Sequence, residues 1–173
     1  PLLYGVRWDP FDWPLEEQLE RLRPGDVVTY CMHEGRGGIA PEGRVVDAAW
    51  KARERGILFD IGHGMSSFDF GVAEAAIADG FLPDTISTDF YKRHADSDPR
   101  HDLPRTLSKL IAAGMAETDA LERVTARPAK TLGLLGQIGA LASGACADLA
   151  VVRWNPNALP LTDVAGETRP GGC

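Results

Sequence analysis

Short apolar runs alternate with amphipathic stretches along most of this chain. Four runs that are rich in apolar and β-branched residues and bounded by turn residues predict strands at residues 1–6, 26–31, 57–61 and 84–89. Stretches with apolar residues three and four positions apart predict helices within residues 13–26, 44–55, 70–79, 103–113, 118–126 and 129–134. A strand is thus followed by a helix several times in succession, which indicates a parallel sheet with helices packed on it.

Two architectures fit four consecutive strand–helix units. One is half of a (β/α)₈ barrel, whose full size is about 250 residues, and the other is a small doubly wound parallel sheet. Polar residues follow three of the predicted strands, in the sequences "YCMHE", "GHG" and "STD". Both architectures place their functional sites at the carboxyl ends of the strands, so we expect the site at this edge.

Charge and motif content exclude several classes of function. The chain has 173 residues, with 18 Lys and Arg against 25 Asp and Glu, and a net charge of −7. We expect no nucleic-acid partner, because phosphate contacts need a basic face. We expect no membrane span, because no apolar run approaches the roughly 20 residues that one requires. No GxGxxG or GxxxxGK[ST] motif occurs, which disfavours a nucleotide site.

The cysteines and the chain ends indicate the protein's setting and extent. The 3 cysteines form no CxxC motif, which favours a reducing, cytoplasmic location over a disulfide framework. The sequence opens "PLLYGVRWDP", without Met, and closes "TRPGGC" in loop-like composition. We therefore expect the chain to be part of something longer.

Three stretches resemble the amidohydrolase superfamily, within it the dihydroorotase-like amidohydrolase/deacetylase branch: "LRPGDVVTYC", "GILFDIGHGMSSFDFGVAEAAIADGFLPDTISTD" and "LPRTLSKLIAAGM". The resemblance implies a (β/α)₈ barrel with one or two divalent metals, usually Zn²⁺, that activate a water. By order the four strands match the fifth to eighth, so residues 1–136 would form the C-terminal half of the barrel. The tail "IGALASGACADLAVV" resembles an exit segment, which implies that residues 137–173 begin a small, truncated β-domain.

Asp89 and His63 match functional positions of the family. Asp89 ends the predicted strand "DTISTD", where the resemblance implies a metal ligand that also takes a proton from the attacking water. A carboxylate can do both, with one oxygen on a cation and the other accepting the proton. His63 lies in "GHG", where the resemblance implies a group that faces the substrate without binding metal. A neutral imidazole there would hydrogen-bond the substrate carbonyl or its oxyanion.

Two positions depart from the family's pattern. Relatives have "THC" after the sixth strand, whereas this chain has "TYC" with Tyr30 at the ligand position, and "LLYGV" leaves Tyr4 or Gly5 where another imidazole is expected. A phenol with a pKa of about 10 is a poor zinc ligand at neutral pH. His33 lies three residues beyond Tyr30 and is a candidate replacement ligand; a plain loop position is the alternative.

The loop "FYKRHADSDPRHD" follows the fourth predicted strand and, by the resemblance, covers the site. His94 and Arg93 in this loop are candidate substrate contacts, since an arginine can pair with a substrate carboxylate through two parallel hydrogen bonds. Solvated surface positions are the alternative for both residues. His101 is a further candidate for contact with substrate.

Two hypotheses of function follow from the resemblance. The first is a metal-dependent hydrolase that cleaves an amide, N-acetyl or ester bond of a small molecule, of the type acting on carbon–nitrogen bonds other than peptide bonds. The second is a degenerate homologue that binds a small ligand or a partner without hydrolysis. Half a barrel leaves open sheet edges and an uncovered apolar interior. We therefore expect self-association or pairing with the missing N-terminal half of the barrel.

Overall fold

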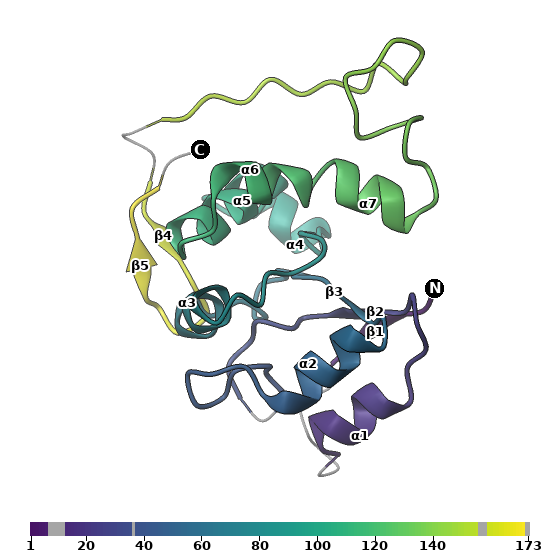
Figure 1. The fold of residues 1–173 in the computed structure, drawn as a ribbon. Coiled ribbons are helices and arrows are strands. Elements are labelled where there is room, and N and C mark those ends of the chain that lie inside the picture. The colour runs from purple at the N-terminus through teal and green to yellow at the C-terminus, as the bar shows by residue number, and fades with distance from the viewer. Residues whose placement is uncertain (7–12, 36, 156–158, 172–173) are drawn as a thin grey trace.

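The computed structural model describes residues 1–6, 13–35, 37–155 and 159–171, and a parallel sheet lies at its centre (Figure 1). Strands β1 (Leu3–Gly5), β2 (Val27–Thr29) and β3 (Leu58–Phe59) pair in that order. Helix α1 (Leu15–Glu20) joins β1 to β2, and α2 (Asp47–Glu54) joins β2 to β3. These two helices pack against each other. The predicted α/β alternation is confirmed for this part of the chain.

The predicted fourth strand, at 84–89, is wrong as an element. Its only regular pairing is one parallel bridge between Asp60 and Thr85. Backbone N–H groups within residues 61–64 still donate to carbonyl oxygens of this segment, so it runs alongside the continuation of β3. Two glycines within 61–64 have φ values of 51° and 50°, which break the extended geometry that a continuous ladder requires.

The later helices lie at the predicted positions with shifted boundaries. One further short helix lies in the loop after Asp89, where the sequence predicts no helix. Helix α5 begins where its sequence indicates, because the Asp102 side chain accepts a hydrogen bond from Arg105 N (3.1 Å) and Pro104 occupies the first turn. The unpredicted helix is α4, a single turn too short to show an apolar period. The bounds are α3 (Phe70–Ala78), α4 (Lys92–Ala95), α5 (Leu103–Ala112), α6 (Glu117–Glu122) and α7 (Ala126–Thr131).

A hairpin near the C-terminus returns to α3 (Figure 1). Strands β4 (Leu161–Thr162) and β5 (Thr168–Arg169) pair antiparallel. Arg169 Nε lies 2.6 Å from Glu74 Oε1 on α3, which ties the hairpin to the helix. Residues 140–155 contain no helix or strand. The division of the chain at residue 136 stays a prediction.

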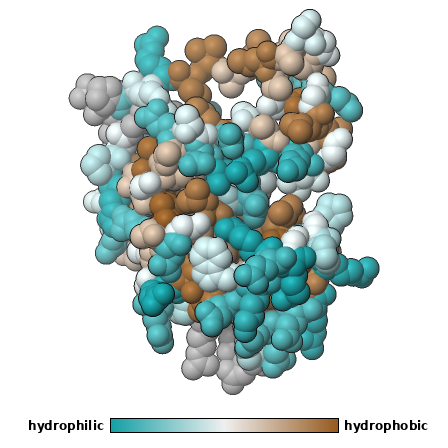
Figure 2. Space-filling view, in the orientation of Figure 1, coloured by the Kyte–Doolittle hydropathy of each residue, from teal (hydrophilic) through white to brown (hydrophobic). Residues whose placement is uncertain are grey.

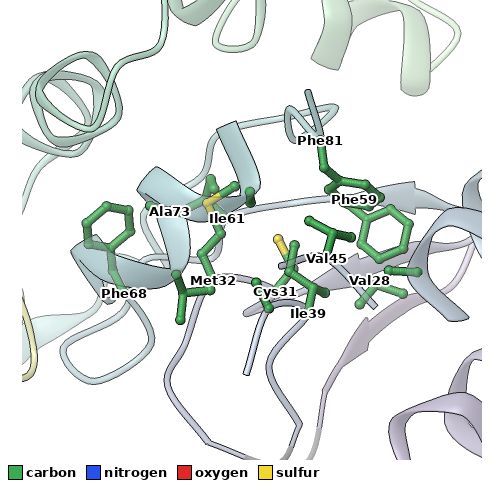
Figure 3. Packing of buried hydrophobic residues seen from close by; sticks show 14 of the residues in the cluster. Val28, Cys31, Met32, Ile39, Val45, Phe59, Ile61, Phe68, Ala73 and Phe81 are labelled. Carbon is green, nitrogen blue, oxygen red and sulfur yellow. The ribbon is translucent and has the colours of Figure 1, made fainter. Parts of the chain in front are cut away.

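The hydrophobic core fills the space between the sheet and its helices (Figure 3). Phe59 of β3 and Phe81 meet edge to face, with ring centroids 4.9 Å apart. Cys31 is fully buried beside them, and burial raises the pKa of its thiol, so it packs as an apolar side chain. Cys31 and Cys146 are free thiols, and Cys173 lies outside the described residues.

Apolar side chains reach the surface at several places, among them the β1 edge and the segment after α7. Leu2 and Leu3, in and next to β1 at the edge of the sheet, are 55% and 66% exposed. Brown atoms also gather along the upper edge of Figure 2. In the segment between α7 and β4, Leu141 and Val151 are exposed. Among the described residues, no helix is long and apolar enough to cross a membrane.

Candidate active site

An open pocket of about 620 Å³ lies at the carboxyl ends of the strands. Its walls come from β1, from the residue after β2, from the loop after β3 and from the segment that ends at Asp89. This pocket therefore lies at the edge of the sheet where the sequence analysis expects the site. The lining residues are Leu3, Tyr4, Gly5, Val6, Tyr30, Gly64, Met65, Ser66, Ser67, Asp89 and Tyr91.

Asp89 and Tyr30 form a hydrogen-bonded pair on the pocket wall. The Tyr30 hydroxyl donates to Asp89 Oδ2 over 3.1 Å. Burial raises the pKa of Tyr30, and the negative charge of Asp89 raises it further, so the phenol stays protonated at neutral pH. Both residues have left-handed backbone, with φ of 64° at Tyr30 and 48° at Asp89. Non-glycine residues in this region are strained, and such strain concentrates at functional sites.

Asp60 ties three segments together close to Tyr30 and Asp89. Its carboxylate is 4% exposed and accepts hydrogen bonds from three hydroxyl groups. The donor from β2 is Thr29 (2.8 Å), and the donors from the segment leading to Asp89 are Thr85 (2.6 Å) and Ser87 (2.6 Å). Bonds to a charged acceptor are stronger than neutral ones, so this network fixes the position of the segment.

The loop over residues 62–67 approaches the Asp89 segment closely. Gly62 has φ of 51°, and a side chain there would collide with the Thr29 hydroxyl. At Gly64, with φ of 50°, an added Cβ would lie 3.5 Å from Asp89 Oδ2. Only glycine takes this backbone freely, which explains the two glycines on either side of His63.

His63 lies behind the pocket wall and is not among the lining residues. Its ring is 4% exposed and stacks on Phe68, with centroids 5.3 Å apart. Nδ1 is 2.6 Å from Gly64 O, and Nε2 is 2.8 Å from Lys109 Nζ on α5. Burial, and then the neighbouring Lys109 ammonium, lower the pKa of His63 to about 3, so the imidazole is neutral. Contact between His63 and a substrate stays a prediction.

The other predicted residues lie apart from the Tyr30–Asp89 pair. His33 is fully buried, with Nδ1 2.6 Å from Glu34 O, and does not line the pocket. His94 is also fully buried and accepts a hydrogen bond from Tyr91 N at Nδ1 (3.2 Å). Arg93 is exposed on α4, two residues after the pocket-lining Tyr91. Asp89 is thus the one predicted site residue that faces the pocket.

The described residues do not fit the metal centre that the resemblance implies. Within the described ranges, no group of three or more His, Cys, Asp or Glu side chains is arranged to hold a metal ion. Asp89 is hydrogen-bonded to the Tyr30 phenol and does not lie beside an imidazole. Because this phenol stays protonated, it is a poor ligand for a metal cation. His33 as a replacement ligand finds no support in this arrangement.

Two features of the site escaped the sequence analysis. Lys109 is 1% exposed, although lysine is rarely buried. Thr106, three positions before it on α5, and Ala113, which follows the helix, are also buried. The role of Tyr30 as a donor to Asp89 was also missed, since no sequence pattern joins residues so far apart in the chain.

Comparison with known proteins shows relatives among both curated sequences and solved structures. A deacetylase from Enterococcus faecalis is 39% identical over 157 residues, which is 90% of this chain and 42% of that protein. A deacetylase from Agrobacterium fabrum is 44% identical over 120 residues, 69% of this chain and 29% of that protein. No family model matches the sequence.

Solved structures match over nearly the whole chain. A structure described as an adenine deaminase superposes with a TM-score of 0.87 at 36% identity, covering 98% of this chain and 46% of that one. A dihydroorotase structure gives 0.80 at 37% identity, covering 99% and 44%. The open sheet therefore corresponds to part of a larger fold, and the described strands do not close into a barrel. The chain is homologous to these proteins of the amidohydrolase superfamily and spans less than half of their length.

Proposed function

We propose that this chain carries part of the active site of a deacetylase-like hydrolase, which cleaves a carbon–nitrogen bond of a small molecule. The observation that carries the proposal is the Asp89 carboxylate on the wall of an open pocket at the strand ends. The homologues named deacetylase support the reaction class. A pocket of about 620 Å³ suits a small-molecule substrate.

Asp89 supplies the proton transfers in this proposal. Its Oδ2 accepts a hydrogen bond from the Tyr30 hydroxyl, and its Oδ1 has no hydrogen-bond partner among the described residues. A water attacks the amide carbonyl carbon and gives its proton to Asp89, and the same proton passes to the leaving nitrogen as the carbon–nitrogen bond breaks. General base catalysis of this kind contributes about 10²- to 10⁴-fold.

Further groups would come from outside the described pocket. Arg93 is a proposed contact for a substrate carboxylate, because α4 begins directly after the pocket-lining Tyr91. The β1 edge is open in the described sheet, and Leu3 on it lines the pocket. We therefore propose that this edge pairs with a second copy or with the N-terminal half of a barrel. Any divalent metal, such as Zn²⁺, would need ligands supplied from there.

A second candidate function is ligand binding without hydrolysis. The observation that favours it is the lack of a metal-holding group within the described ranges, together with Tyr30 where relatives have an imidazole. The Tyr30–Asp89 pair offers both a hydroxyl and a carboxylate to a polar ligand. A protein of this kind would bind small amides without cleaving them.

Acetate release from a panel of N-acetyl amino acids distinguishes the two functions. The purified chain is assayed with and without added zinc, and bound metal is measured in parallel. We expect turnover that Asp89→Asn lowers by about 10²-fold or more, whereas the exposed Asp96→Asn on α4 leaves it unchanged. Saturable binding of the same compounds without turnover, in either condition, would establish the second function instead.

A further inference from the structure

A buried lysine sets the hydrogen-bonding state of His63. Lys109 Nζ lies 2.8 Å from His63 Nε2, and both side chains are less than 5% exposed. An ammonium group has three donors and no acceptor, so Nε2 must be the acceptor in this bond. The remaining ring proton of a neutral imidazole is then on Nδ1, which donates to Gly64 O over 2.6 Å. Lys109 and the Gly64 carbonyl therefore both select the Nδ1–H tautomer of His63.

The chain of bonds continues from His63 to the pocket. Gly64 N donates to Thr88 O (3.1 Å), next to Asp89, and His63 N donates to Ser87 O (3.0 Å). Gly64 also lines the pocket, next to the Asp89 carboxylate. Lys109 on α5 is thus connected, through the His63 imidazole, to the 62–67 loop and to the neighbouring segment that ends at Asp89.

Packing alone does not account for a lysine at this position. Leu107 and Leu110 on the same helix are buried as apolar residues, whereas position 109 buries a charged one. The lysine instead places its ammonium 5.5 Å from the Phe68 ring centre, on the same ring that stacks on His63. Burial is the main cause that lowers the pKa of Lys109, to about 8, which leaves it mostly protonated at neutral pH.

The charged and titratable groups around the pair come from three elements. His101 has its ring centre 5.7 Å from that of His63, and His94 on α4 lies 5.8 Å from His101. Arg105 on α5 repels the Lys109 charge, and Asp163 of the hairpin attracts it. Asp163 is the acidic group that acts on Lys109, and Lys109 forms no ion pair with a carboxylate among the described residues.

We infer that Lys109 is a positioning residue, which acts through His63 to hold the 62–67 loop against the segment that ends in Asp89. This inference rests on the proposed function only in taking the pocket as the reaction site. It assigns His63 a role in shaping the wall, with its ring bound on both sides by the protein.

Histidine NMR tests the inference directly, because the chain has only 4 histidines. Two-bond ¹H–¹⁵N imidazole spectra at pH 7, assigned with His63→Gln, should show His63 of the wild type as the Nδ1–H tautomer. In Lys109→Met the Gly64 carbonyl still holds the proton on Nδ1, but the pKa of His63 should rise by about one unit or more because the ammonium is lost. Lys109→Arg, which keeps a donor, should retain the wild-type tautomer.

Backbone amide shifts separate positioning from mere packing. In Lys109→Met the amides of Gly64, Thr88 and Asp89 should move, whereas Lys51→Met, on the exposed face of α2, should leave them in place. An Nε2–H tautomer in the wild type would overturn the inference even if Lys109→Met failed to fold. Unmoved amides at Gly64 and Asp89 in a folded Lys109→Met would also overturn it. These spectra need no turnover, so a failure of the proposed hydrolysis is a separate result.

Discussion

Asp60 provides the sharpest test of how the candidate site is held together. Replacing it with alanine removes the acceptor of three hydroxyl donors, Thr29, Thr85 and Ser87. Each hydrogen bond to a charged group contributes about 1.5–3 kcal/mol, but freed hydroxyls can rotate toward other acceptors. We therefore expect Asp60→Ala to lower the free energy of unfolding by about 3–5 kcal/mol, a large part of the roughly 5–15 kcal/mol typical of a domain.

Asparagine at the same position separates charge from shape. Asp60→Asn keeps the size and one carbonyl oxygen, so we expect a loss of only about 1–2 kcal/mol. The assay is urea unfolding followed by circular dichroism, with the exposed Asp96→Ala expected within about 0.5 kcal/mol of wild type. A double-mutant cycle of Asp60→Ala with Ser87→Ala should show coupling of about 1 kcal/mol. An Asp60→Ala protein as stable as Asp96→Ala would refute the reasoning.

Three further predictions concern the pocket, acid stability and the open edge. Tyr30→Phe removes the bond to Asp89, and we expect kcat/KM for acetate release to fall about tenfold, the equivalent of about 1.4 kcal/mol; an unchanged value would show that Tyr30 does not hold the carboxylate. The folded-state pKa of His63, about 3, lies below its ordinary value of 6.5. Its stabilising contribution is therefore complete above pH 6.5 and is lost as the pH falls toward 3, with a slope of at most about 1.4 kcal/mol per pH unit. Urea midpoints should show this loss, and His63→Gln should lack that part of the slope. Leu3→Lys, at the exposed β1 edge, should shift any dimer seen by light scattering toward monomer; an unchanged mass of a wild-type dimer would place the interface elsewhere.

The elements that local sequence specifies were predicted well. The β-branched run at 26–31 contains β2, and α5 begins at an aspartate cap followed by proline. The predicted strand at 84–89 failed because its neighbour, the 61–64 loop, has left-handed glycines, and a strand needs a regular partner as well as a suitable sequence. Local patterns therefore identify helices more reliably than the last strand of an open sheet.

The direction of side chains in the site was harder to predict. Contact of His63 with a substrate stays a prediction, and in the structure the His63 ring lies against Lys109. Alternation along a strand gives the facing of a side chain only while the backbone stays extended. Gly62 and Gly64 interrupt that geometry on both sides of the histidine, so no count along the sequence could have given its direction.

The Tyr30–Asp89 pair changes what the departure from the family's pattern means. From the sequence alone, a tyrosine in place of an imidazole indicates only the loss of a metal ligand. In the fold the phenol donates to the carboxylate that remains, and both residues keep left-handed backbone although neither is glycine. Strain at two facing positions persists only where the surroundings enforce it, and here Asp60 fixes the segment that leads to Asp89. The substitution therefore leaves an organised donor–acceptor pair at the pocket, and the chemistry of the site depends on what Asp89 does with its second oxygen.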